Sequence, residues 1–591
     1  MENRINGGGR LSSLSVTFRR LCRESFLGGL LISGDADDFA KRTRISEKIR
    51  NKLIIPLKRS FGSLCDRSQL VKFGNFILGS VRNVPLRSVG VTYFTFGIFT
   101  LLVYLLQRIV FNSLQGSGNF VYGLICLILS GISMTSSQRI GDALSDGLIL
   151  SFISDRLLLD DRQMAERGGS RRPPHVGTLI FSGIFFGAVS ELTSFAFAAL
   201  LPVFMVLSLK ILKQPSFGVM VLLCACPFVG SAELTAVSLF VIASTFFKVL
   251  CGKRKIVRSF SGIVVIVIAL LVIISGIRGG FGDAVGHVSA MLLFFPVVAL
   301  FKTEKRIERL AFCLAVPGIL ISVITVVSFL LTLFNSIPWL PTFEVFAPPV
   351  GLIVSLTCVS IPMTVVSADI TYVRDLKLVG FFAVVTELAA LYLSLGIAAL
   401  LTGVAVYGIT LMTVYRRASG PVLTAAMLLI SAGIAFGDLL NLKPSASGVF
   451  FRLVARLPVS LLVFGGGFGP ECTNETISEM TGIQIPPTGL EGVSSILMSV
   501  GLIGGLFAAL VATACVLNAL KLSISSNVAG EHRVIAAGCA SAVIGCALVS
   551  LMFDPFSATA GTALIFCCIG ASKAVDELSA EQRQLLGREL Y

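Results

Sequence analysis

Long apolar runs separated by short polar stretches make up most of this chain from residue 88 onward. A helix needs about 17–25 mostly apolar residues to cross a bilayer. Sixteen segments approach that length: 88–110, 118–135, 176–190, 194–212, 216–231, 233–251, 259–277, 284–301, 309–334, 346–366, 377–394, 396–415, 420–438, 492–519, 533–553 and 556–575. Several are short, and some are joined by tight hairpins. The pattern therefore predicts an all-α polytopic membrane protein with about 13–16 transmembrane helices and one large outer loop.

Polar stretches divide the chain into regions of different character. Two spans precede a polar block that contains Arg-Arg-Pro-Pro, and the remaining spans follow it. The expected regions are a basic cytoplasmic or membrane-surface region (1–87), a two-span appendage (88–135), a cytoplasmic linker (136–175), a main bundle (176–575) with its outer loop (439–491), and a cytoplasmic tail (576–591).

Composition excludes a soluble domain. The chain is 54% hydrophobic and 14% charged with a mean hydropathy of +0.88, whereas soluble domains carry about 25% charged residues. The net charge of +15 is uneven, because residues 1–87 hold 17 Lys or Arg against 7 Asp or Glu and so contribute +10.

The positions of basic residues predict the orientation. With sixteen spans, both termini lie on one side, and so do the basic loops near 253–255, 302–309, 374–377, 416–417 and 532–533. The opposite side keeps only Arg278, Lys443, Arg452 and Arg456. Because basic loops stay in the cytoplasm, we expect a multi-pass plasma membrane protein with both termini cytoplasmic and loop 439–491 outside.

The N-terminal region contains a helical pattern. Ile49, Leu53, Leu57, Phe61 and Cys65 recur every four residues, with basic residues off that line. This spacing predicts a basic helix on the lipids of the inner leaflet. The alternative is a solvated linker helix.

The sequence lacks the residue patterns that metal sites and nucleotide-binding loops require. The chain has only three His, and its 14 Cys show no metal-ligand spacing, so most are interpreted as small core residues. There is no phosphate-binding GxxxxGK[ST] loop. We expect no metal, no cofactor and no nucleic-acid partner.

Ionisable residues inside spans are candidates for function. Glu387 is the best of these, while Glu191, Glu233 and Asp438 lie at outer ends. The Glu-Leu pairs that begin at Glu191, Glu233 and Glu387 form a weak repeat. It is typical of capped helical hairpins, but an inverted-repeat transporter also fits it.

Arginines on the outer side suggest a function, because basic residues of membrane proteins concentrate in cytoplasmic loops. Guanidinium groups bind phosphate with two hydrogen bonds, so Arg278, Arg452 and Arg456 are candidate ligands for a lipid-linked pyrophosphate. The alternatives are interface snorkelling or ion pairs with Asp283, Glu471 or Glu491.

Local sequences occur in a recognisable order. They are Ser-Ser-Gln-Arg-Ile-Gly-Asp-Ala-Leu-Ser at 136–145, Phe-Ala-Pro-Pro at 346–349, the Arg-bearing segment 445–456, Phe-Gly-Gly-Gly-Phe-Gly-Pro at 464–470 and Ser-Val-Gly-Leu-Ile-Gly-Gly at 499–505. In this layout, over about 130–575, the chain resembles the bacterial O-antigen ligase and polymerase family, particularly its larger members with a basic N-terminal region.

The resemblance implies a glycosyltransferase-type activity in cell-surface polysaccharide assembly. Family members join polyprenyl-pyrophosphate-linked glycans to an acceptor at the outer face. By this resemblance, Arg452 is the expected pyrophosphate ligand, assisted by Arg456 and Arg278. The implied partners are a lipid-linked oligosaccharide and other polysaccharide-assembly membrane proteins.

The chain departs from the family pattern at the expected base. The family's loop His would fall near Leu490, but loop 439–491 has no His, and Ser499 and Val500 replace the usual Glu. The resemblance therefore leaves Glu491 or Glu471 as the expected catalytic base. The alternatives are a non-catalytic paralogue that acts as a scaffold or regulator, and a transporter or lipid flippase.

Overall fold

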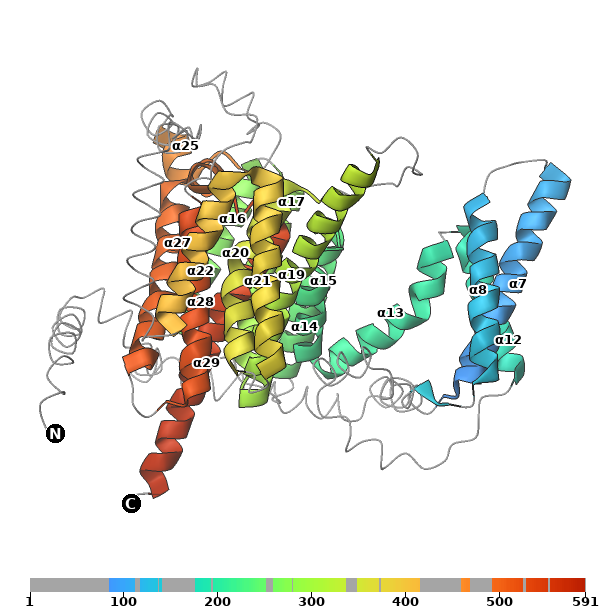
Figure 1. Ribbon diagram of the computed structural model, residues 1–591, viewed down its shortest axis with the longest axis horizontal. Coiled ribbons are helices and arrows are strands. Elements are labelled where there is room, and N and C mark those ends of the chain that lie inside the picture. Colours follow the sequence, from blue (N-terminus) through green and yellow to red (C-terminus); the bar gives the residue numbers. More distant parts are fainter. Residues whose placement is uncertain are drawn as a thin grey trace, which may run out of the picture. The chain divides into compact units, whose positions relative to one another are not determined.

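The regular elements of the computed structural model are helices (Figure 1). The structure describes residues 84–111, 117–136, 138–140, 176–192, 195–250, 259–278, 280–335, 348–370, 374–414, 459–467, 492–524, 528–550 and 553–589. The predicted basic helix at 49–65, most of the linker at 136–175 and most of the loop at 439–491 lie outside these residues.

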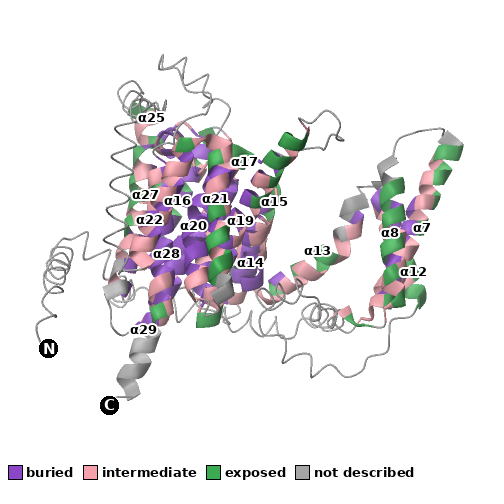
Figure 2. Ribbon diagram, in the orientation of Figure 1, coloured by how far each residue is buried: buried purple, intermediate pink, exposed green. Residues whose placement is uncertain are grey.

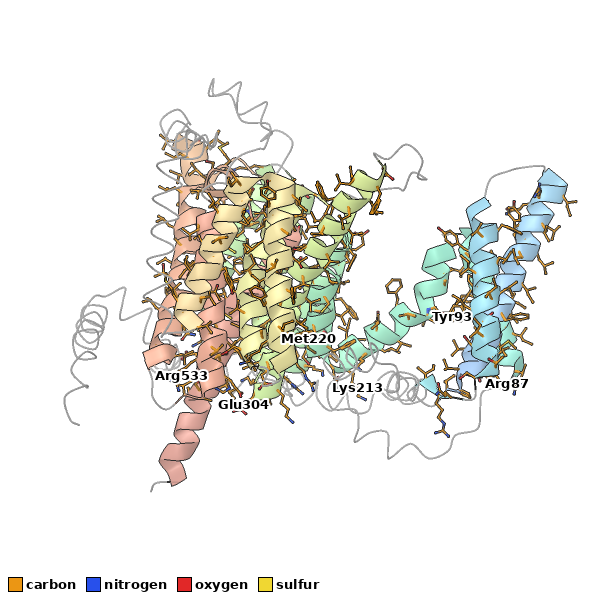
Figure 3. The ribbon with its side chains drawn as sticks, in the orientation of Figure 1. Arg87, Tyr93, Lys213, Met220, Glu304 and Arg533 are labelled. Atoms are coloured by element: carbon orange, nitrogen blue, oxygen red, sulfur yellow. The ribbon has the colours of Figure 1, made fainter. Side chains whose placement is uncertain are left out.

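The described helices belong to two compact units that meet in sequence between Gly218 and Val219. The N-terminal unit contains α7 (Leu86–Phe111), α8 (Ser117–Thr135), α12 (Val176–Leu192) and α13 (Phe195–Lys213). In this unit α7 packs against α8 and α12. The Tyr93 hydroxyl, labelled in Figure 3, donates a hydrogen bond to the Ala199 carbonyl at 2.8 Å and so connects α7 to α13. Thus α12 and α13 pack with the first two spans, although the sequence pattern groups them with the later ones.

The C-terminal unit is a larger bundle that begins within α14. Its helices are α14 (Pro215–Ala225), α15 (Ser231–Leu250), α16 (Phe260–Arg278), α17 (Phe281–Leu292), α18 (Phe294–Leu300), α19 (Glu304–Asn335), α20 (Val350–Ile370), α21 (Arg374–Leu395), α22 (Ile397–Val414), α25 (Val459–Phe464), α27 (Gly492–Ile524), α28 (Gly530–Val549) and α29 (Thr559–Glu589). The last helix continues to Glu589, so residues 576–589, expected as a tail, extend α29.

The core of this bundle lies around α20 and α28, where buried residues concentrate (Figure 2). α20 packs against α19, α21, α22, α28 and α29. Two of its four buried hydroxyls, those of Ser355 and Thr357, bond to their own helix, and Thr357 donates to the Ile353 carbonyl at 2.7 Å. Such bonds let polar side chains lie in a core that holds little water.

The fold class predicted from the sequence is confirmed. Ten helices among the described residues are long and apolar enough to cross a membrane: Leu86–Ile109, Ser231–Leu250, Phe260–Arg278, Phe281–Leu300, Glu304–Asn335, Val350–Ile370, Lys377–Leu395, Ile397–Val414, Gly492–Ala519 and Gly530–Val549. The predicted spans near 118–135, 176–190 and 216–231 form shorter apolar helices. Those near 194–212 and 556–575 form α13 and α29, and 420–438 lies outside the described residues.

The two ends of the bundle are named here by the residues that mark them. The Arg278 end is where α16 terminates, and the Lys302 end is where α18 passes into α19. Glu304 and Arg533 lie at the Lys302 end in Figure 3.

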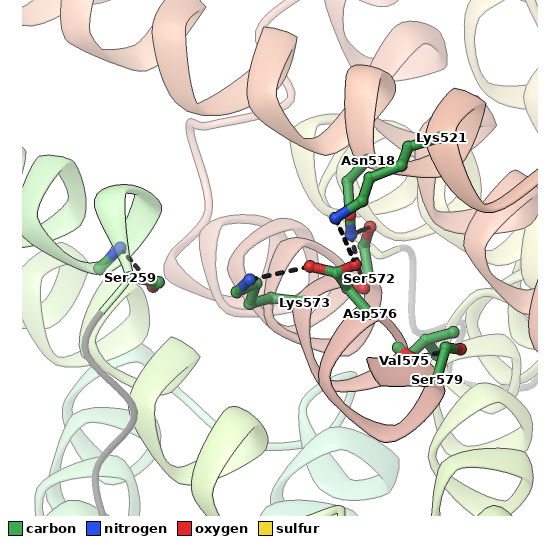
Figure 4. Close-up of polar contacts among 9 residues, drawn as sticks. Ser259, Asn518, Lys521, Ser572, Lys573, Val575, Asp576 and Ser579 are labelled. Atoms are coloured by element: carbon green, nitrogen blue, oxygen red, sulfur yellow. Dashed lines mark hydrogen bonds and ion pairs between the residues drawn. The ribbon is translucent and has the colours of Figure 1, made fainter. Parts of the chain in front are cut away.

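Side chains connect α27 to α29 toward the Lys302 end (Figure 4). Asp576 accepts hydrogen bonds from Lys521 at 3.0 Å and from Lys573 at 2.9 Å. One turn away, the Asn518 amide donates to the Ser572 carbonyl at 2.8 Å. These bonds fix the lateral position of α27 on α29.

Candidate functional site

A cavity of about 720 Å³, lined by both polar and apolar residues, lies at the Arg278 end of the main bundle. Its walls come from the starts of several helices: Ser231 of α15, Asp283 of α17, Gly351 of α20, Ser495 of α27 and Thr559 of α29. The first amides of a helix have no partner within that helix, and its dipole is positive at this end. The cavity is therefore suited to hold negative charge, although two carboxyl groups also line it.

The first of these carboxyl groups, Asp554, is set by a turn between α28 and α29. Its Oδ1 accepts the Phe556 amide at 2.9 Å, and its carboxyl also hydrogen-bonds to Ser495 at the start of α27. Burial raises the pKa of Asp554 above its ordinary value, although hydrogen bonds from Ser495 and nearby amides act in the opposite direction. A carboxylate whose pKa is raised and which faces a cavity is a suitable proton acceptor.

The second carboxyl group, Asp283, shares the wall with His287, one turn further along α17. The His287 ring is buried, and its Nδ1 lies 3.0 Å from the Thr562 hydroxyl of α29. This bond fixes the orientation of the ring across the interface between α17 and α29. The cavity therefore combines two carboxyl groups and an oriented imidazole.

Arg278 lies next to this cavity and contacts the end of α25 and the residues that follow it. Its guanidinium donates to the Gly465 carbonyl at 3.0 Å and lies 5.8 Å from the centre of the Phe464 ring. Gly467, two residues further on, lines the cavity. Arg278 thus positions the backbone of 465–467 instead of pairing with Asp283, which was the alternative considered from the sequence.

The loop after α25 crosses α27 where that helix is broken. Gly501 has φ 73° and ψ −179°, a conformation that only glycine adopts readily. A Cβ on Gly501 would lie 2.3 Å from the Val463 carbonyl oxygen, so the two backbones touch here. The carbonyls freed near the break are used elsewhere: Met498 accepts the Gly466 amide at 2.6 Å, and Ser499 accepts the Ser275 hydroxyl.

The structure places only one of the predicted site residues. Arg278 contacts Gly465 next to the cavity but is not one of the residues that line it, whereas Arg452, Arg456, Glu471 and Glu491 lie outside the described residues. Within the part of the chain that the structure describes, no group of three or more His, Cys, Asp or Glu could hold a metal ion.

The Glu-Leu repeat places its acidic residues in unlike positions. Glu191 falls in the last turn of α12 and Glu233 in the first turn of α15, whereas Glu387 is fully buried within α21. Only Glu233 is at a helix start, where a carboxylate favours the dipole. Capping therefore does not account for all three members.

Asp554 and His287 were missed as site residues by the sequence analysis. Asp554 stands before a proline in the turn between two spans, on the side predicted to be outside, and that signal could have identified it. His287 gave no such signal, because it lies inside an apolar segment.

Comparison with known proteins identifies no relative: no family model, no curated protein and no solved structure matches this chain.

Proposed function

We propose that this protein transfers a polyprenyl-pyrophosphate-linked glycan to an acceptor at the outer face of the plasma membrane, in the manner of O-antigen ligases and polymerases. The observation that carries the proposal is the cavity at the Arg278 end, where Asp554, Asp283 and several helix starts meet. Its volume of about 720 Å³ falls within the range of small-molecule sites. Carboxylates and hydroxyls suit a sugar, and helix starts suit a phosphate.

The chemistry assigned to the cavity is one displacement. Asp554 accepts the proton of the acceptor hydroxyl as its oxygen bonds to the anomeric carbon. The bond from that carbon to the pyrophosphate oxygen breaks, and polyprenyl pyrophosphate leaves with the electron pair. Helix starts stabilise the pyrophosphate charge.

Loop residues complete this proposal. Arg452 and Arg456 contact the pyrophosphate, and Glu471 or Glu491 is the alternative base. Arg278 holds the Gly465 loop beside the cavity. In this arrangement the Arg278 end faces outside, both termini are cytoplasmic, and other polysaccharide-assembly proteins supply the lipid-linked substrate.

The activity is tested in liposomes that contain the purified protein, a polyprenyl-pyrophosphate-linked glycan and an acceptor glycan. Removing a general base typically lowers a rate by about 10²–10⁴-fold, so we expect Asp554→Asn to reduce product formation to that extent. Glu233→Gln is the matched control, because Glu233 is an exposed carboxylate at the same end that does not line the cavity. Equal rates for Asp554→Asn and wild type would reject Asp554 as the base.

Two further variants separate this enzyme from a scaffold. Arg452→Ala and Arg456→Ala should lower product formation without lowering the amount of protein in the membrane. No product from the wild-type protein, together with intact binding of partner proteins, would instead favour the scaffold.

Orientation is tested with an impermeant thiol reagent on intact cells. Val459 of α25 and Lys305 of α19 are exposed at opposite ends of the bundle. We expect Val459→Cys to react in intact cells and Lys305→Cys only after permeabilisation. The reverse pattern would overturn the topology and the proposed reaction together.

A transporter is the second candidate, because Glu387 is a buried carboxyl in the membrane-spanning region. In a transporter that depends on Glu387, Arg452→Ala and Arg456→Ala would be tolerated, and Glu387→Gln would abolish the activity.

A further inference from the structure

Glu387 is an ionisable residue in a setting that excludes water. It lies in the candidate span Lys377–Leu395 of α21, and its side chain is fully buried. An ionised carboxylate in such a place requires a cation or several hydrogen-bond donors. The contacts of Glu387 therefore indicate which form of the carboxyl the fold accommodates.

Those contacts provide a single hydroxyl group. Glu387 Oε1 is hydrogen-bonded to the Ser360 hydroxyl of α20, and that hydroxyl is also hydrogen-bonded to the Ala315 carbonyl of α19. Glu387 Oε2 has no hydrogen-bond partner. A serine hydroxyl carries one hydrogen, and a carbonyl can only accept. Both contacts are complete when Ser360 donates to Ala315 and a protonated Glu387 donates to the Ser360 oxygen.

No cation substitutes for that proton among the described residues. The helices packed against α21 are α19, α20 and α22. The charged residues of α19 and α20, which are Glu304, Lys305, Arg306, Glu308, Arg309 and Asp369, belong to their Lys302 ends. The remaining titratable groups of these three helices are Cys313, which hydrogen-bonds to Cys224, Cys358, which contacts Cys546, and Tyr407 of α22. In α21 itself, Tyr392 is uncharged at neutral pH, and Lys377 lies ten residues before Glu387 at the Lys302 end. None of these supplies a positive charge to Glu387.

The backbone is shaped around this group. A Cβ on Gly318 would lie 2.2 Å from the Ser360 Cβ and 3.1 Å from Glu387 Oε1, so the absence of a side chain lets α19 approach α20 here. Pro317 and Pro362 each remove one amide from the hydrogen-bond ladders of α19 and α20.

Polar side chains continue along the helices in both directions. Ser322 lies one turn beyond Gly318 in α19, toward the Arg278 end, and Thr364 lies one turn beyond Ser360 in α20, toward the Lys302 end. Both hydroxyls are buried and have no hydrogen-bond partner. They provide free polar positions on either side of the carboxyl.

We infer that Glu387 is a proton-binding site inside the membrane, where the carboxyl proton is held by Ser360 and exchanges with solvent past Ser322 and Thr364. Release transfers the proton to water and leaves a carboxylate to which Ser360 is the one hydroxyl donor, so the protonated form is the resting state and uptake is favoured. The site does not depend on glycan transfer and would remain if that function were rejected.

The test uses dicyclohexylcarbodiimide, an apolar reagent that modifies protonated carboxyl groups, on the full-length protein in liposomes. Peptide mass spectrometry should find the modification on Glu387 at neutral pH, and it should decrease as the pH rises. Glu387→Gln should abolish this modification, while Glu233→Gln, which alters an exposed carboxylate, should leave it unchanged. Protection by Na⁺ at constant pH would overturn the inference in favour of a metal-cation site.

Infrared spectroscopy of the same samples tests the protonation of Glu387 even if dicyclohexylcarbodiimide does not reach it. The carbonyl band of a protonated carboxyl should be present in the wild type, absent in Glu387→Gln and shifted in Ser360→Ala. Ser360→Ala removes the acceptor but keeps the carboxyl, so an unchanged band would reject the role of Ser360. The absence of the band from the wild-type protein would overturn the site itself.

Discussion

The two ends of α27 are held by different kinds of contact. At the Arg278 end, α27 is broken at Gly501, and backbone groups make the contacts: the Met498 carbonyl accepts the Gly466 amide, and the Ser499 carbonyl accepts the Ser275 hydroxyl. Toward the Lys302 end, the side chains of Asn518 and Lys521 fix the helix on α29. One helix therefore contributes to an open cavity at one end and, at the other, to a set of side-chain contacts with α29, called the clasp here and made by Asn518, Lys521 and Asp576.

The two kinds of contact should tolerate different substitutions. Backbone contacts require a particular chain path, so they fail when a side chain is added where only hydrogen fits. Side-chain contacts near the surface can be replaced by water, so losing one has a small effect. We expect the cavity end to be sensitive to steric change and the opposite end to tolerate loss of charge.

The largest expected effect on stability is that of Gly501→Ala. Alanine is strained at φ 73° and ψ −179° by about 1–3 kcal/mol, and its Cβ would also clash with the Val463 carbonyl. We expect a lower unfolding temperature in detergent and loss of glycan transfer. Gly505→Ala is the control, because its Cβ would meet only the Ile496 side chain at an ordinary 3.7 Å. Similar behaviour of the two variants would contradict the proposed crossing of backbones.

The pH dependence of glycan transfer tests whether Asp554, which hydrogen-bonds to Ser495 at the start of α27, is the base. Burial raises the pKa of Asp554, and the base must be ionised to accept a proton. As the medium is acidified, the rate should therefore begin to fall at a pH above the pKa of an ordinary aspartate. Ser495→Ala removes a bond that lowers this pKa, so the acidic limb should move to still higher pH. If the rate of Ser495→Ala falls at the same pH as that of the wild type, Asp554 is not the base.

The same raised pKa affects stability with a definite sign. The folded state holds the Asp554 proton to a higher pH than the unfolded chain does. The contribution of Asp554 is therefore complete below the ordinary aspartate pKa and is lost as the pH rises through the raised value. Asp554→Asn should remove this dependence from the free energy of unfolding.

The smallest expected effect is that of Lys521→Ala at the clasp. The Lys521 side chain is 40% exposed, and Asp576 keeps Lys573 as a second partner. Because Lys521 reaches solvent and Asp576 keeps a second cation, we expect a contribution near that of a surface ion pair, about 0–1 kcal/mol. The unfolding temperature should therefore change little and should recover in part with Lys521→Arg. A loss as large as that of Gly501→Ala would show that the clasp, like the cavity end, depends on one fixed geometry.

The sequence predicted the spans well where apolar runs are long, as at Phe260–Arg278 and Val350–Ile370. It also identified Arg278 and Glu387, because a charge is conspicuous against an apolar background. It did not identify Asp554 or His287 as neighbours in one cavity, since these residues lie in different parts of the chain. The break at Gly501 was likewise hidden, because glycine is common throughout an apolar bundle.

The sequence by itself determined that this is an all-α, multi-pass membrane protein, because hydropathy over some twenty residues is a local property that needs no knowledge of neighbours. The tertiary structure alone decided that α15, α17, α20, α27 and α29 begin around one cavity, and that the Glu387 carboxyl meets the Ser360 hydroxyl. Those arrangements depend on how helices distant in the chain pack together. Packing follows from side-chain shape and hydrogen bonding between elements, which no single segment encodes.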